Sequence, residues 1–207
     1  MMMERKEVST IYTIGHSTHP IERFLELLEM NGITAVADVR SSPFSRHNPQ
    51  FNQDTLSAEL KKRGIAYVFV GKELGARSDD PSCFEAGKVR YGRLARTSIF
   101  KAGIDRVLSG ADKFRVALMC AEKEPLDCHR TLLVSRALEQ QGVSIFHILS
   151  DGSTEAQPKT MCRLLDLVGL PQVDMFRSHE ELVEAACEMR EEKIAYVDES
   201  LADEEHS

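Results

Sequence analysis

The sequence predicts a three-layered α/β domain, in which helices flank a mostly parallel five-stranded sheet. Two observations predict this fold class. Five short β-branched or apolar runs punctuate the first 150 residues, and amphipathic helical patterns lie between them. Strands that alternate with helices are typical of a parallel sheet covered on both faces. At 207 residues, with 29% charged and 42% hydrophobic, the chain suffices for one such domain and a tail.

The individual elements follow the chain in order. We expect the five strands at Ser9–Ile14, Ile33–Val39, Ile65–Val70, Phe114–Met119 and Val143–Leu149. We expect the helices at Pro20–Met30, Asp54–Lys62, within Ser98–Leu108, from about Cys128 to Gln141, at Glu155–Val168 and at about Ser178–Glu192. Gly32, Gly64 and Gly142 end three of these helices, because glycine readily adopts the left-handed conformation that follows a helix.

Two segments depart from this alternation. Residues 71–92 contain four glycines and are expected to form an inserted lid. Residues 171–207 are expected to form an acidic C-terminal helical extension or tail, so that a single α/β domain spans residues 1–170. Residues 178–207 hold eleven acidic and two basic side chains, whereas residues 61–106 hold eleven basic and five acidic ones. The tail therefore supplies most of the negative charge.

Composition excludes several classes of protein. A net charge of −7 argues against a uniformly basic nucleic-acid binder. The sequence has neither a run of about 18 apolar residues, as a membrane span requires, nor the apolar core of a signal peptide. The five cysteines are scattered and form no C-x-x-C pair, which favours a reducing compartment over a disulfide framework. We therefore expect a cytoplasmic protein with no membrane partner.

Most of the reactive side chains follow the predicted strands directly. In an open parallel sheet, ligands bind outside the carboxyl ends of the strands, so these residues are expected along one edge. The candidate catalytic residues are three acid/base groups and one nucleophile: His16, Asp38, Glu122 and Cys128. The candidate ligand-binding residues are Gly15, Ser17, Arg40, Ser41, Ser45, Arg46, Lys72, Tyr91, His129 and Arg130.

Arginine side chains give this edge its expected preference for anions. Arg40, Arg46 and Arg130 present the planar fork of donors that suits a carboxylate or phosphate. Arg130 is also expected in the first turn of a helix, where free backbone N–H groups favour an anion. The alternative is an internal ion-pair network, in which acidic neighbours such as Asp38 or Glu122 neutralise the arginines.

Several short motifs together resemble a known family. They are Thr13–Ser17 (TIGHS), Asp38–Pro43 (DVRSSP) with Ser45-Arg46 and Pro49–Phe51, Leu74-Gly75, and Cys120–Glu122 through Pro125 to Cys128-His129-Arg130. In this order they resemble the bacterial and archaeal domain of unknown function 488 family, over roughly residues 10–150. The resemblance implies an α/β fold and brings no established reaction. The family often has a second glycine after Leu-Gly, whereas Ala76-Arg77 follows here.

The first functional hypothesis is an enzyme or enzyme-like binder of a small anionic ligand, phosphorylated or nucleotide-like, of hydrolase or transferase type. The arginines would hold the anion, and a carboxylate paired with an arginine could orient a histidine base. The lid, with Lys72, Arg77 and Tyr91, could close over the ligand and exclude water.

Two alternatives remain open. The chain could be a non-catalytic module that binds nucleic acid or protein through the basic stretch 61–106, whose aromatic residues could stack bases. It could also hold a thiol-redox or metal site at Cys120 and Cys128, with His129 as a third metal ligand. The sequence assigns no cofactor, and a homodimer would be ordinary for a domain of this size.

Overall fold

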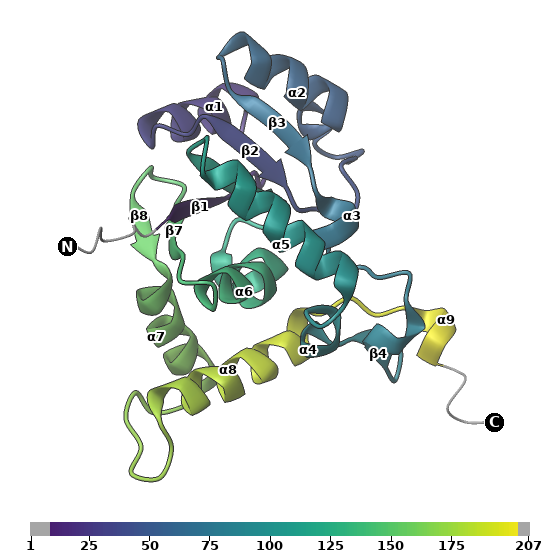
Figure 1. Cartoon of the computed structure of the whole chain (residues 1–207), viewed down its shortest axis with the longest axis vertical. Coiled ribbons are helices and arrows are strands. Elements are labelled where there is room, and N and C mark those ends of the chain that lie inside the picture. Colours follow the sequence, from purple (N-terminus) through teal and green to yellow (C-terminus); the bar gives the residue numbers. More distant parts are fainter. Residues whose placement is uncertain (1–8, 203–207) are drawn as a thin grey trace, which may run out of the picture.

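The structure, a computed structural model, describes residues 9–202 and contains the predicted α/β fold (Figure 1). Its central sheet has the strand order β3-β2-β6-β1-β7-β8. The first five of these strands run parallel to one another: β3 (Ala66–Phe69), β2 (Ala35–Asp38), β6 (Val116–Cys120), β1 (Thr10–Gly15) and β7 (Ser144–Ile148). They correspond to the five strands predicted from the sequence.

The sheet has a sixth strand that the sequence analysis missed. β8 (Thr154–Ala156) pairs antiparallel with β7 at the edge, where a helix was expected to begin at Glu155. That helix, α7 (Gln157–Val168), starts after the strand. Pro158 lies in its first turn, a position where proline is favoured because the missing N–H is not needed there. The proline was therefore the available signal for the true helix start.

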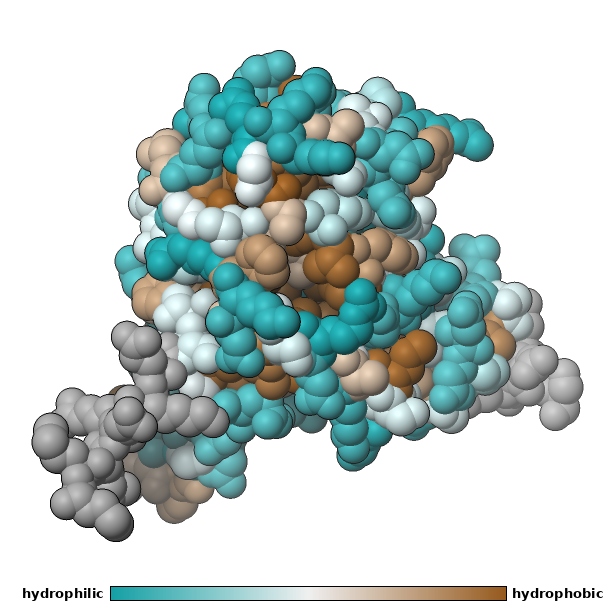
Figure 2. Space-filling model, turned by 45° about the horizontal axis from the view of Figure 1, so that its top comes forward, coloured by the Kyte–Doolittle hydropathy of each residue, from teal (hydrophilic) through white to brown (hydrophobic). Residues whose placement is uncertain are grey.

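Helices cover both faces of the sheet (Figure 1). On one face, α1 (Ile21–Met30) and α2 (Gln53–Lys62) bury apolar side chains against β1, β2 and β6. The other face carries α5 (Ser98–Ala111), a π-helical segment (Arg130–Ser135) that continues into α6 (Arg136–Glu139), and α7. The space-filling view shows a largely hydrophilic surface with apolar residues between the charged ones (Figure 2).

Residues 71–92, the predicted lid, form short packed elements. They comprise α3 (Gly71–Leu74), a hairpin of β4 (Phe84–Glu85) and β5 (Lys88–Val89), and the start of α4 (Tyr91–Leu94). The hairpin is bonded to the C-terminal segment: Val89 N–H donates to the Tyr196 carbonyl over 2.9 Å, and Asp198 N–H donates to the Gly87 carbonyl over 2.7 Å.

The acidic C-terminal region folds onto the domain as α8 (His179–Ile194) and α9 (Glu199–Ala202). Ser178 caps α8 through a capping box with Glu181. Ion pairs join α8 to the rest of the chain, including Arg90 with Glu192 at 2.6 Å and Arg190 with Asp127. Within residues 9–202, no helix has the length and apolar character that crossing a membrane demands.

A buried histidine links the sheet to α7. His147 is fully buried in the core. Its Nδ1 accepts the hydroxyl of Thr13 at 2.7 Å, and its Nε2 donates to Gln157 Oε1 at 2.6 Å. Burial is the main cause that lowers the pKa of His147 to about 4, and burial likewise lowers the pKa of His16 to about 4.

These two histidines predict a loss of stability on mild acidification. Between pH 6.5 and pH 4 each takes up a proton in the unfolded chain but not in the folded one, so the free energy of unfolding should decrease as the pH falls. The expected slope is about 1.4 kcal/mol per pH unit for each histidine. Urea unfolding of His147→Gln over this range should give a shallower slope, whereas His179→Gln, at an exposed site, should leave the slope unchanged. Equal slopes in all three proteins would contradict the prediction.

Candidate functional site

The carboxyl ends of β1, β2 and β6 meet at one edge of the sheet, beside a cavity of about 340 Å³. Six of the predicted site residues line this cavity: Arg40, Ser41, Tyr91, Glu122, Cys128 and His129. Cys120 lines it as well. The C-terminal segment contributes Ile194 and Tyr196, which the sequence analysis missed because no local signal connects them to this edge.

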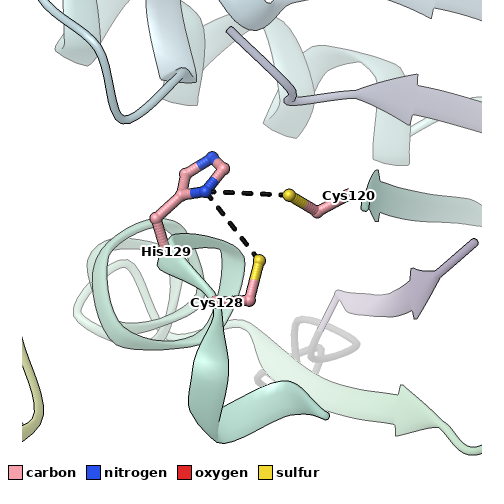
Figure 3. A group of neighbouring side chains, drawn as sticks. All are labelled: Cys120, Cys128 and His129. Carbon is pink, nitrogen blue, oxygen red and sulfur yellow. Dashed lines mark hydrogen bonds between the residues drawn. The ribbon is translucent and has the colours of Figure 1, made fainter. Parts of the chain in front are cut away.

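Two cysteines and a histidine that line the cavity point toward one another (Figure 3). Nδ1 of His129 lies 3.7 Å from Cys120 Sγ and 3.8 Å from Cys128 Sγ. All three potential ligand atoms lie within 4.8 Å of one another, and all three residues are buried. The Glu122 carboxylate joins them, with Oε2 at 3.3 Å from Cys120 Sγ and 3.6 Å from Cys128 Sγ. We call Cys120, Glu122, Cys128 and His129 the thiol cluster.

The chain forms this cluster within one short connection. Cys120 ends β6, and a 3₁₀ turn at Pro125–Asp127 brings the chain back to the same place. Cys128 was expected in the first turn of a helix. Instead it lies just before the helical segment in an extended conformation, with φ −137° and ψ 139°, because the turn ends at Asp127. The seven residues between Cys120 and Cys128 thus bring the Cys128 thiol close to the Cys120 thiol.

His129 is oriented like a metal-binding histidine. Its Nε2 donates to the carbonyl of Val39 at 3.0 Å, which leaves Nδ1 to face the two sulfurs. Histidines that bind metals commonly donate their other ring N–H to a carbonyl or carboxylate in this way. The same Nδ1 could instead share a proton with a thiolate. The geometry therefore admits both chemistries that the sequence left open at this site.

The thiol cluster perturbs the titration of its members. Burial opposes ionisation of Cys128, but the hydrogen bond from Cys120 and the nearby charge of Arg130 lower the pKa of Cys128 well below its ordinary value. The hydrogen bond to Cys128, together with burial, raises the pKa of Cys120. Burial, followed by the charge of Cys128, raises the pKa of Glu122. Of the two thiols, Cys128 is therefore the one that ionises more readily.

Arg130 is buried and engaged with the backbone. Its side chain is fully buried, with Nη1 donating to the Glu122 carbonyl at 2.6 Å and Nη2 to the Lys123 carbonyl at 3.2 Å. The loop it holds lies against β1, where a Cβ at Gly15 would be 1.8 Å from the Glu122 carbonyl oxygen. Arg130 and Gly15 therefore position the loop of the thiol cluster, and neither lines the cavity.

Asp38 and Arg40 form a buried ion pair that uses most of their hydrogen-bonding capacity. Arg40 Nε donates to Asp38 Oδ1 at 2.9 Å, and Nη2 donates to Oδ2 at 2.6 Å. Oδ2 also accepts the hydroxyl of Tyr67 at 2.8 Å, and Nη2 also donates to the Phe51 carbonyl. This is the internal network that the sequence analysis kept as the alternative to anion binding.

His16 is held in its neutral form by the same network. Its Nδ1 donates to the Ser17 carbonyl at 2.8 Å, and its Nε2 accepts from Arg40 Nη1 at 3.1 Å. The imidazole also stacks on Phe51, with ring centroids 4.3 Å apart. Because both ring nitrogens are occupied, His16 offers no free lone pair to a substrate. Among the predicted acid/base groups, Glu122 is therefore the one that reaches the cavity.

The remaining predicted residues lie outside the lining of the cavity. Ser17 has φ of +48° and donates its N–H to the Ala121 carbonyl at 2.8 Å, so it serves the turn after β1. Ser45 Oγ accepts the Asn48 N–H at 3.0 Å within its own loop. Arg46 and Lys72 are exposed.

Comparison with known protein families shows which family the chain matches. The family model described as "Domain of unknown function DUF488" matches residues 20–137, which is more than half of the chain. No curated protein matches the chain, and no solved structure does. The match includes Asp38, Arg40 and the whole thiol cluster, whereas Ile194 and Tyr196 lie outside it.

The ion pair of Asp38 and Arg40 predicts two graded losses of stability. Asp38→Asn should lower the free energy of unfolding by about 3–5 kcal/mol, because it leaves a buried guanidinium without its counter-charge. Tyr67→Phe removes one hydrogen bond to the carboxylate and should cost about 1.5–3 kcal/mol. Urea denaturation measures both changes, with Asp54→Asn on the exposed side of α2 as the control. Unaltered stability in Asp38→Asn would mean that the pair has no structural role.

Proposed function

Because the chain belongs to the DUF488 family, a domain of unknown function, we propose an activity from the site itself: a metal-dependent enzyme of hydrolytic type. Cys120, Cys128 and His129 would bind a zinc-like divalent ion, and Glu122 would act as the proton acceptor. The observation that carries this proposal is the convergence of three buried sulfur and nitrogen donors in the lining of a cavity.

The donor set favours zinc over other common ions. Zn²⁺ prefers thiolate sulfur and imidazole nitrogen, whereas Mg²⁺ and Ca²⁺ prefer oxygen. Three protein ligands with one position left for solvent or substrate are characteristic of catalytic zinc sites, whereas structural sites usually have four. Here the three donors border a cavity, which provides the space for that fourth position.

The electrostatics of the cluster also favour a cation. The Glu122 carboxylate lies within 3.6 Å of both sulfurs, the two sulfurs lie within 4.8 Å of each other, and each of the three groups gains a negative charge when it ionises. The guanidinium of Arg130 is nearby, but backbone carbonyls occupy it. A divalent ion would compensate this concentration of acidic groups and stabilise both thiolates.

The chemistry follows from these positions. A divalent ion bound there would supply a Lewis acid and lower the pKa of a bound water. The carboxylate of Glu122 lies beside the proposed ligands, with Oε2 3.3 Å from Cys120 Sγ, and would be placed to accept a proton from that water. In this proposal, Cys128 is a metal ligand and not the nucleophile.

The proposal retains the small anionic ligand of the first hypothesis but moves the chemistry away from His16 and Asp38. The nucleic-acid alternative has less support, because acidic partners neutralise several of the basic side chains in residues 61–106. Arg90 and Arg93 pair with Glu85 at 2.8 and 2.7 Å, and Arg106 pairs with Glu73.

Metal binding provides the direct test. Protein titrated with Co²⁺ should bind about one ion and develop the thiolate charge-transfer absorption and visible bands of a tetrahedral site. Cys128→Ser and His129→Ala should weaken binding strongly, whereas Cys187→Ser, at a buried cysteine elsewhere, should not. Equal Co²⁺ binding by all variants, or no binding by the parent protein, would contradict the proposed centre.

Glu122→Gln separates metal binding from catalysis. The zinc-loaded parent protein should hydrolyse p-nitrophenyl acetate or p-nitrophenyl phosphate faster than the chelator-treated protein. Glu122→Gln should reduce that rate by about 10²–10⁴-fold while the Co²⁺ spectrum is retained. Glu180→Gln on the exposed surface of α8 is the control. If chelation leaves the rate intact and Cys128→Ser abolishes it, the thiol is the nucleophile and the metal proposal is wrong.

A further inference from the structure

We infer that Arg77, supported by Tyr196, binds an oxyanion group of the substrate, phosphate or carboxylate, in the cavity beside the thiol cluster. The inference rests on the proposed function only in taking this cavity as the substrate pocket. It assigns Arg77 a recognition role, in place of the part in lid closure that the sequence analysis gave it.

The guanidinium of Arg77 is free to bind a ligand. Arg77 lines the cavity, and its side chain makes no hydrogen bond or ion pair with any residue between 9 and 202. Its Cζ lies 4.7 Å from the centre of the Tyr196 ring, in a cation–π contact that orients the planar group. Arg40, which also lines the cavity, is committed to Asp38.

Three hydroxyl groups line the cavity together with Arg77 and can donate to a ligand. Ser41 Oγ accepts the backbone N–H of Arg77 at 3.0 Å, so its own proton remains available. Within the described part of the chain, the hydroxyls of Ser42 and Tyr91 have no hydrogen-bonded acceptor. Of the lining carboxylates, Asp127 is paired with Arg190, and Glu122 belongs to the thiol cluster. The positive charge of Arg77 and these hydroxyl donors together suit a ligand that is rich in acceptors and negatively charged.

Backbone contacts fix the two segments that carry Arg77 and Tyr196. A Cβ at Gly75 would lie 2.4 Å from the Gly71 carbonyl oxygen and 2.6 Å from Ser41 Oγ, so glycine lets the chain pass close before Arg77. Tyr196 is fixed through its carbonyl, which accepts the Val89 N–H. Tyr196 lies beyond the family match of residues 20–137, so the support of Arg77 comes from outside that match.

A second cleft provides the matched control. It has a volume of about 650 Å³ and lies between α4, α6 and α8. Most of its arginines are paired with glutamates, as Arg136 is with Glu184. Arg96 is the exception: like Arg77 it is exposed and forms no ion pair with a described residue, but it lies in the other cleft.

The experiment measures the binding of inorganic phosphate and of acetate by calorimetry, in zinc-loaded and in metal-free protein. Arg77→Ala should weaken binding of the preferred anion by about tenfold or more, because it removes charge-assisted hydrogen bonds. Arg96→Ala should bind like the parent protein. Arg77→Lys keeps the charge but loses the stacked, forked geometry, and Tyr196→Leu removes the support, so both should fall between the parent and Arg77→Ala.

The outcomes separate the two proposals. Anion binding that Arg77→Ala weakens and Arg96→Ala does not would support the subsite, and the ratio of phosphate to acetate affinity would identify the oxyanion. Anion binding that is absent, or equal in parent and Arg77→Ala, would overturn it even when zinc binds as proposed. If zinc does not bind, the metal proposal fails, and the metal-free series still decides the role of Arg77.

Discussion

The candidate site depends on one buried guanidinium. Arg130 donates to the carbonyls of Glu122 and Lys123 and so fixes the loop that returns from Cys120 to Cys128. A buried charge is stable only when its hydrogen bonds are made. If this loop shifted, Arg130 would become exposed to solvent or would lose its hydrogen-bond acceptors. Gly15 permits the close approach on which the contact relies. The distances within the thiol cluster follow from that constraint.

The arginines at this edge divide into two kinds. Arg40 and Arg130 are buried and committed to protein acceptors, whereas Arg77 is exposed and uncommitted. All three carry the same guanidinium group. Protein acceptors surround Arg40 and Arg130, which therefore support the structure, whereas Arg77 has no such acceptors among residues 9–202 and is the one proposed to bind a ligand. Other basic side chains are paired in the same way. Glu192 of the acidic helix α8 forms ion pairs with Lys88 of the hairpin and with Arg90 beside it. Part of the charge asymmetry in the sequence is therefore neutralised by ion pairs between the acidic helix and the rest of the chain.

Strand–helix alternation was sufficient to predict the α/β class and five strands, because buried parallel strands leave uninterrupted apolar runs. The edge strand Thr154–Ala156 is too short for such a signal, and its pairing with β7 overrides local preference. The residues at the strand ends were correctly grouped at one edge. Whether each of these residues lines the cavity or supports it depends on hydrogen bonds between distant segments, such as the one between Arg40 and His16. No spacing along the chain indicates these hydrogen bonds. Tyr196 was missed for the same reason.

The thiol cluster is compact in sequence, but the cavity around it is not. All four of its members lie between Cys120 and His129, whereas Ile194 and Tyr196 complete the wall some sixty residues later. During synthesis these four residues therefore leave the ribosome well before the segment that completes the cavity wall. If the cluster binds zinc as proposed, a nascent chain would meet the ion while the cluster is still open to solvent, and the C-terminal segment would enclose it afterwards.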